Sequence, residues 1–181
     1  LVNATDAEVY CHVNALDKIP KATHGLQSGD IIHIGNIKLE ILDTPGHTMA
    51  HVCILVYKNE KPFAIFSGDT LFNAGAGNCY SGNIDDLYNT FVNILFKLPD
   101  EVLVYPGHDY LENNLKFTLN REPDNHYASD LLGQAQTLAA NTFIITTLGI
   151  ERQINTFFRL NNKIDSKNQY RNTIHFTKKR K

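Results

Sequence analysis

Apolar and polar positions alternate along the first part of the chain in short runs separated by turn residues, and this pattern predicts β-strands. The expected strands cover residues 8–11, 31–34, 37–42, 50–57, 63–66 and 101–105. Gly35 and Asn36 stand between two of these runs and predict a tight hairpin turn. Between residues 84 and 98 the apolar positions instead recur every three or four residues, which predicts an α-helix that Pro99 ends.

Beyond residue 108 the pattern becomes helical. Helices are expected at residues 111–119 and 127–142, separated by a polar stretch, and a third is expected at 148–154. From Asn161 onward the chain is polar and ends in four basic residues, which is typical of a solvated, frayed terminus. The expected organisation is therefore a mixed α/β domain at residues 1–120 and a helical domain with a basic tail at residues 121–181.

Composition limits the classes of function. The chain has 181 residues, of which 43% are hydrophobic, so it can bury the core of one domain or of one domain with a helical appendage. Its net charge of −2 gives no general attraction to nucleic acid or to an anionic membrane, and no apolar run is long enough to span a bilayer. The three cysteines are scattered, which favours a reducing compartment; we expect the cytoplasm, with an organelle as the alternative. The oligomeric state is left open.

Three of the predicted strands end in a glycine that is followed at once by a residue able to bind metal. These residues are His47, Asp69 and His108. Glycine lets the backbone turn sharply where each strand ends, so the three side chains can meet at one rim of the sheet. Imidazole nitrogen and carboxylate oxygen suit zinc, iron or manganese, and a carboxylate can bridge two ions. The pattern therefore predicts a metal site that activates water and polarises a carbonyl group.

The other histidines are interpreted as structural. They are His12, His24, His33, His126 and His175. His51 follows His47 by four residues, a spacing that would place both on one face of a helix. Because this segment is expected to be a strand, in which side chains alternate between two faces, His51 is also left out of the site.

Longer motifs surround the three candidate ligands. They are Thr44-Pro45-Gly46-His47-Thr48, Ser67-Gly68-Asp69-Thr70-Leu71-Phe72-Asn73-Ala74-Gly75-Ala76-Gly77, Gly107-His108-Asp109-Tyr110-Leu111-Glu112-Asn113-Asn114-Leu115-Lys116-Phe117, and Glu122-Pro123-Asp124-Asn125. These segments resemble the metallo-β-lactamase superfamily, and more closely its glyoxalase II branch, the hydroxyacylglutathione hydrolases. The resemblance extends from near residue 1 to about residue 159 and implies an αβ/βα sandwich followed by a helical domain.

The resemblance implies roles for the candidate ligands. His47 would bind the first of two metal ions and His108 the second, while Asp69 would bridge both ions and be the central catalytic residue. The family's His-x-His-x-Asp-His motif, which supplies the other ligands, does not occur in this sequence. We therefore expect the chain to be the larger, C-terminal part of a longer enzyme. On its own it is expected to hold a partial sandwich, at most one weakly bound ion and negligible activity.

The resemblance also indicates residues that would face the glutathione part of a substrate. They are Asn78, Tyr80, Tyr110, Asn114, Arg159 and Lys163. Asn78 departs from the family, which has a basic residue at this position for the glycine carboxylate of glutathione. The positive charge that Asn78 lacks is expected to come from Arg159 and Lys163.

The activity that the resemblance implies is hydrolysis of glutathione thioesters, such as lactoylglutathione, to a hydroxy acid and glutathione, a step of methylglyoxal detoxification. Zinc is the expected metal, with iron or manganese as alternatives. A second interpretation is the persulfide dioxygenase branch, an iron oxidoreductase with the same ligands, which Asn113-Asn114 and the long helical C-terminus disfavour. A third is a non-catalytic remnant that binds glutathione.

Overall fold

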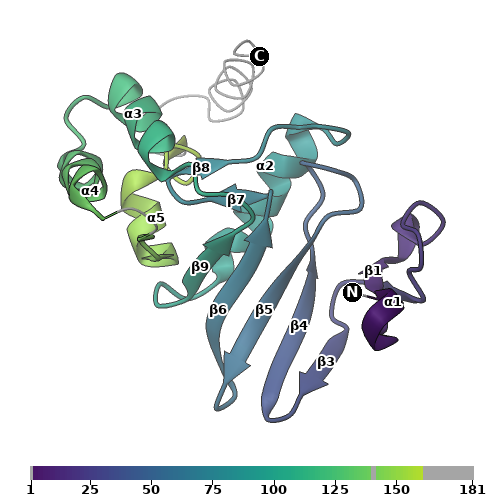
Figure 1. Cartoon of the computed structure of the whole chain (residues 1–181). Helices are drawn as coiled ribbons and strands as arrows, with labels where there is room; N and C mark the ends of the chain where they lie inside the picture. Colours follow the sequence, from purple (N-terminus) through teal and green to yellow (C-terminus); the bar gives the residue numbers. More distant parts are fainter. Residues whose placement is uncertain (1, 140–141, 161–181) are drawn as a thin grey trace.

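The computed structural model describes residues 2–139 and 142–160, and its centre is a six-stranded mixed sheet. In spatial order the strands are β10 (Thr146–Thr147), β9 (Leu103–Pro106), β6 (Lys61–Gly68), β5 (Val52–Lys58), β4 (Ile37–Asp43) and β3 (Ile31–Ile34). Strands β3 to β6 are antiparallel neighbours, whereas β9 runs parallel to β6 (Figure 1). Strands β4, β6 and β9 therefore point the same way, and their carboxyl ends meet at one edge of the sheet.

One face of the sheet is covered by α2 (Ile84–Asn93) and the 3₁₀ turn η2 (Leu95–Lys97). Leu87, Phe91 and Leu95 are buried against the strands in the main core. The Asn83 side chain caps α2 by accepting a hydrogen bond from the backbone N–H of Asp86. The α-helix ends at Asn93, so the sequence-based end at residue 98 is wrong for the α-helix itself.

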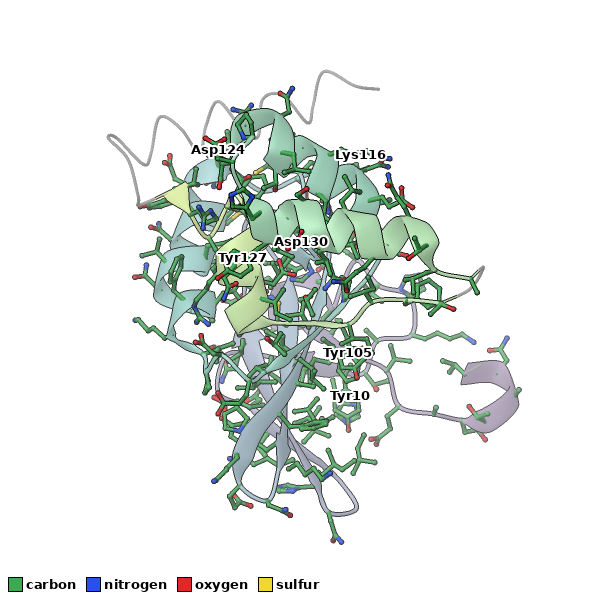
Figure 2. The ribbon with its side chains drawn as sticks, turned by 90° about the vertical axis from the view of Figure 1, so that its left-hand side faces the viewer. Tyr10, Tyr105, Lys116, Asp124, Tyr127 and Asp130 are labelled. Atoms are coloured by element: carbon green, nitrogen blue, oxygen red, sulfur yellow. The ribbon has the colours of Figure 1, made fainter. Side chains whose placement is uncertain are left out.

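A second, smaller core lies beyond the β9 side of the sheet. There α3 (Leu111–Arg121), α4 (His126–Thr137) and α5 (Leu148–Ile154) gather (Figure 1). Helix α4 lies at the surface of this group and carries the exposed Tyr127 and Asp130 (Figure 2). It ends before the predicted residue 142.

The C-terminal part of the described chain joins the two cores. Residues Phe157, Phe158 and Leu160 are buried in the main core with α2 and the sheet, although they follow α5 in the chain. The division that the sequence predicts at residue 121 falls at the last residue of α3, which packs on α4.

The N-terminal segment lies beside β3 and β4, on the opposite side of the sheet from the three helices (Figure 1). It comprises α1 (Val2–Thr5), β1 (Tyr10–His12), the 3₁₀ turn η1 (Val13–Ala15) and β2 (His24–Leu26). Nε2 of the buried His12 lies 3.2 Å from Oδ1 of Asp43 at the end of β4.

A small hairpin of β7 (Leu71–Phe72) and β8 (Gly75–Ala76) follows β6. In the described ranges, no helix has the length and apolar character needed to cross a membrane.

Candidate metal centre

The three candidate ligands meet at the sheet edge where β4, β6 and β9 end. Asp69 follows β6 directly, His47 lies in the turn after β4, and His108 follows β9. Nε2 of His47 is 3.6 Å from Oδ2 of Asp69, and Nδ1 of His108 is 2.9 Å from Oδ1 of the same carboxylate. The structure therefore brings together the two imidazoles and the carboxylate that the sequence pattern predicted to converge.

The orientation of His47 suits a metal ligand. Its Nδ1 lies 2.6 Å from the backbone carbonyl oxygen of Asn78. A carbonyl oxygen only accepts hydrogen bonds, so Nδ1 carries a proton, and Nε2 is the nitrogen left to present a lone pair to a metal ion. That lone pair faces the Asp69 carboxylate, and two electron-rich atoms facing each other form an arrangement that a cation between them would stabilise.

Two glycines let the backbone pass close to Asp69. A Cβ on Gly77 would lie 1.7 Å from the carbonyl oxygen of Asp69 and 3.3 Å from Nδ1 of His47. A Cβ on Gly107 would lie 2.5 Å from Oδ1 of Asp69. Any other residue at either position would displace Asp69, so these glycines are required by the close approach of three segments to one carboxylate.

His51, which the sequence pattern does not assign to the site, holds Asp69 in place. Its Nε2 accepts a hydrogen bond from the Asp69 backbone N–H at 3.2 Å, and its Nδ1 lies 2.9 Å from the hydroxyls of Thr44 and Thr70. Burial, with a smaller contribution from His47, lowers the pKa of His51 to about 4, so the ring is neutral near pH 7. His51 precedes β5 rather than lying within it, and the four-residue spacing from His47 was the signal that could have identified it.

The donors fit part of a metal-ligand set. Among residues 2–139 and 142–160, no group of three or more His, Cys, Asp or Glu side chains is arranged to hold a metal ion by itself. His47 and His108 instead form two pairs that share Asp69. Their chemistry suits zinc, iron or manganese. Three ligands are fewer than two ions need, so further donors or water would have to complete the coordination.

Three of the predicted substrate-binding residues lie at the rim of this centre. The Tyr110 ring stacks on the His108 ring, with centroids 5.3 Å apart and an interplanar angle of 8°. Tyr80 is 76% exposed, and its ring centroid is 6.3 Å from that of His47. The side-chain Oδ1 of Asn78 is buried without a hydrogen-bond partner. Tyr80 and Tyr110 thus flank the candidate ligands.

Asn114 and Arg159 make structural contacts with other elements. Nδ2 of Asn114 donates a hydrogen bond to the carbonyl oxygen of Asn73 at 2.9 Å, which fixes a neighbouring loop to α3. Nε of Arg159 donates to Oε2 of Glu122 at 2.7 Å, at the opposite end of α3 from Tyr110. Lys163 lies outside the described residues. The substrate roles of Asn114, Arg159 and Lys163 stay predictions.

A mainly apolar cavity of about 330 Å³ opens beside His108. The end of β9 forms one wall, and the segment before β10 forms another. Tyr105, at this end of β9, is marked in Figure 2. The lining residues are Asn73, Val104, Tyr105, Pro106, Gly107, His108, Asp109, Phe143, Ile144 and Ile145.

Comparison with solved structures identifies the class of protein. A metallo-β-lactamase from Staphylococcus aureus superposes with a TM-score of 0.68 at 24% identity, covering 96% of this chain and 46% of that chain. ETHE1 from Myxococcus xanthus superposes with a TM-score of 0.67 at 26% identity, covering 96% of this chain and 60% of that chain. The fold is thus that of the metallo-β-lactamases, as the sequence predicted, and this fold implies a metal centre.

Sequence comparison finds relatives that share one name. Residues 109–180 match the family described as "Hydroxyacylglutathione hydrolase C-terminus". The hydroxyacylglutathione hydrolase of Nitrosococcus oceani is 48% identical over 164 residues, which are 90% of this chain and 62% of that protein. That of Polaromonas sp. is 49% identical over 162 residues, 88% of this chain and 61% of that protein. The chain is thus similar to the hydroxyacylglutathione hydrolases, and it spans about three fifths of the length of these curated relatives.

Proposed function

We propose that the protein of which this chain forms part hydrolyses glutathione thioesters, with lactoylglutathione as substrate and lactate and glutathione as products. The observation that carries the proposal is the convergence of His47 and His108 on the Asp69 carboxylate. It occurs in a chain that is 48% identical to a protein named hydroxyacylglutathione hydrolase. Zinc is the proposed metal, with iron or manganese as alternatives.

Each residue of the centre has a distinct part in this proposal. His47 and His108 would hold metal, and Asp69 would be shared between two ions. Bound ions would polarise the thioester carbonyl and make water a stronger nucleophile near neutral pH. The backbone carbonyl of Asn78 keeps the lone pair of His47 directed at the centre, and the neutral ring of His51 fixes the backbone of Asp69.

The rim suits an extended peptide-like substrate. Tyr80 and Tyr110 are both exposed and offer aromatic surface and hydroxyl groups on either side of the ligands. The three rim residues, these two tyrosines and Asn78, carry no positive charge. Because glutathione is anionic, we propose that cations elsewhere, Arg159 and Lys163 being the candidates, bind its carboxylates.

A second candidate function is favoured by the ligand set itself. Two histidines and one carboxylate are the ligands that mononuclear iron oxygenases use. His47, Asp69 and His108 have this combination of side chains, arranged as two pairs that share Asp69. The alternative is therefore an iron-dependent persulfide dioxygenase, for which one iron per chain and oxygen uptake with a persulfide substrate would be required.

The experiment joins this chain to the part of the Nitrosococcus oceani relative that it does not match. The zinc-loaded protein is assayed with lactoylglutathione, and the iron-loaded protein is assayed for oxygen uptake. We expect thioester hydrolysis that falls by at least about 100-fold in Asp69→Asn. It should be unchanged in Asp130→Asn, which removes an exposed carboxylate on α4 (Figure 2). Oxygen uptake without hydrolysis would establish the alternative, and equal rates in both variants would refute the role of Asp69.

A further inference from the structure

A fully buried carboxylate lies on α5, outside the candidate metal centre. Glu151 is 0% exposed, and both of its carboxylate oxygens are occupied. Oε1 accepts a hydrogen bond from Oγ1 of Thr146 at 2.6 Å, while Oε2 accepts from Nδ2 of Asn155 at 2.8 Å and from the backbone N–H of Ala74 at 2.9 Å. Burying an ionisable group is costly unless such partners satisfy it. Thr146 and Asn155 flank α5, whereas Ala74 is 77 residues away in the chain, so Glu151 ties α5 to a distant loop.

That loop, residues 73–74 between β7 and β8, has an unfavourable backbone conformation. Ala74 is fully buried with a φ of +56°, in the left-handed region. For a residue with a Cβ this conformation is less stable than the right-handed one. The hydrogen bond from the Ala74 N–H to Glu151 opposes that cost and satisfies a buried donor.

Other side chains from the C-terminal half fix the same loop. Nδ2 of Asn155 donates to the carbonyl oxygen of Gly75 at 3.0 Å, and Nδ2 of Asn73 donates to Oγ1 of Thr146 at 2.7 Å. Thr146 and Asn155 are also the partners of Glu151. The carboxylate is therefore the shared acceptor of a buried network whose members all hold one short hairpin.

The hairpin in turn contacts the candidate centre. The ring of Phe72 lies edge-on to His108, with centroids 6.0 Å apart. On the other side of the hairpin, Gly77 N–H donates to the carbonyl oxygen of Thr70 at 3.2 Å, next to Asp69. The following residue, Asn78, orients His47. A shift of the hairpin would thus be transmitted to all three candidate ligands.

We propose that Glu151 is a positioning residue for the metal centre, which acts by holding the segment 71–78 through the Ala74 N–H. It contacts neither the candidate ligands nor the substrate rim directly. The proposal deepens the proposed function and rests on it for any effect on catalysis. The expected effects of Glu151 on the segment and on metal affinity follow from the contacts of this residue and do not depend on the proposed activity.

The test uses the 181-residue chain and compares Glu151→Leu, Glu151→Gln and Glu112→Gln. Leucine offers no acceptor, whereas glutamine can present its oxygen to Ala74 and its amide group to Thr146. Glu112 is an exposed carboxylate on α3 and serves as the charge-matched control. Two quantities are measured: hydrogen exchange at the Ala74 amide and zinc affinity by calorimetric titration. Protection of the β4–β5 amides reports whether the sheet remains folded.

We expect Glu151→Leu to speed Ala74 exchange by about tenfold or more and to weaken zinc binding by about tenfold, with the β4–β5 amides still protected. Glu151→Gln should remain within about threefold of the parent in both measurements. Glu112→Gln should give the same values as the parent. If Glu151→Leu has no effect on either measurement, or no more effect than Glu112→Gln, the proposal is refuted.

A further variant keeps the test decisive if Glu151→Leu does not fold. Thr146→Val removes the hydroxyl that both Glu151 and Asn73 contact, and should speed Ala74 exchange by about threefold or more. Unchanged exchange in this variant would overturn the proposal. Failure of the proposed function is a separate result, because a protein that lacks thioesterase activity can still show these effects of Glu151 on loop exchange and zinc affinity.

Discussion

Arg159 pairs with Glu122 in a half-buried ion pair that joins the segment after α5 to the end of α3. Truncating either partner leaves the other charge without its hydrogen bond, so Arg159→Ala and Glu122→Gln should each lower the free energy of unfolding by about 1–2 kcal/mol. The predicted substrate role adds a second effect. In the protein that joins this chain to the unmatched part of its relative, Arg159→Ala should raise KM for lactoylglutathione with little change in kcat. The lost interaction would stabilise the bound substrate and the transition state equally.

Glu122→Gln is the matched control for that measurement. It breaks the same ion pair without removing a cation, so it should leave KM unchanged. A loss of stability in both variants with no change of KM in either would show that Arg159 joins two elements and does not bind substrate.

The buried carboxyl group of Glu151 makes stability depend on pH. Burial raises its pKa from an ordinary 4.5 to about 7, although hydrogen bonds from Thr146, Asn155 and the Ala74 N–H favour the charged form. The folded chain therefore holds this proton more tightly than the unfolded chain does. The resulting stabilisation is complete below pH 4.5 and is lost as pH rises to about 7.

Denaturant titrations of the parent and Glu151→Gln across this range measure the effect. Between pH 4.5 and about 7, the free energy of unfolding of the parent should fall by up to about 1.4 kcal/mol per pH unit relative to that of the variant. A stability difference between the two proteins that stays constant from pH 4.5 to 7 would contradict the assignment.

The sequence predicted the three candidate ligands because each follows a strand and a glycine, and both features are visible in residue types. For His51 the only signal was its four-residue spacing from His47, because its role depends on the conformation of the turn that leads from β4 to β5. The backbone carbonyl of Asn78 was equally inaccessible, since every residue has a carbonyl group and only the fold directs this one at His47. Glu151 gave no signal because its partner Ala74 is 77 residues away in the chain and only the fold brings the two together.

At the level of elements, strands were predicted more accurately than helix ends. The alternating runs and the Gly35-Asn36 turn correspond to β3, β4, β5 and β6. The helix predicted to reach residue 98 ends at Asn93 because apolar spacing reports burial and not the hydrogen-bond pattern. Leu95 remains in the core while its backbone lies in a 3₁₀ turn.

Two glycines should respond oppositely to substitution by alanine. At Gly77 the new Cβ would overlap the Asp69 carbonyl oxygen, so Gly77→Ala should destabilise the fold by about 2 kcal/mol or more. Gly133 is exposed inside α4 with nothing within 4 Å of the added Cβ, so Gly133→Ala should stabilise by about 0.5–1 kcal/mol. Urea unfolding of both variants gives the sign directly. If Gly77→Ala raises the free energy of unfolding or leaves it unchanged, the close approach of Gly77 to the Asp69 carbonyl oxygen does not constrain the fold.

At the scale of the whole molecule, the two faces of the sheet differ. Helix α2 covers one face, whereas apolar side chains on the other remain exposed, with Ile34 at 62% and Phe66 at 49%. The sandwich expected from the sequence has layers on both faces, and the comparison structures confirm the fold class. We expect the part of the longer relatives that this chain does not match to pack on this exposed face and to bring the remaining metal ligands.

We propose that His47, Asp69 and His108 bind metal together, with Asp69 as the shared ligand. Zinc titration of the 181-residue chain and of Asp69→Ala, followed by calorimetry, tests it most directly. The parent should bind at most one zinc ion per chain, weakly, because three ligands leave much of the coordination to water. Binding should disappear in Asp69→Ala while both proteins remain folded. Equal zinc binding by the two folded proteins would contradict the claim.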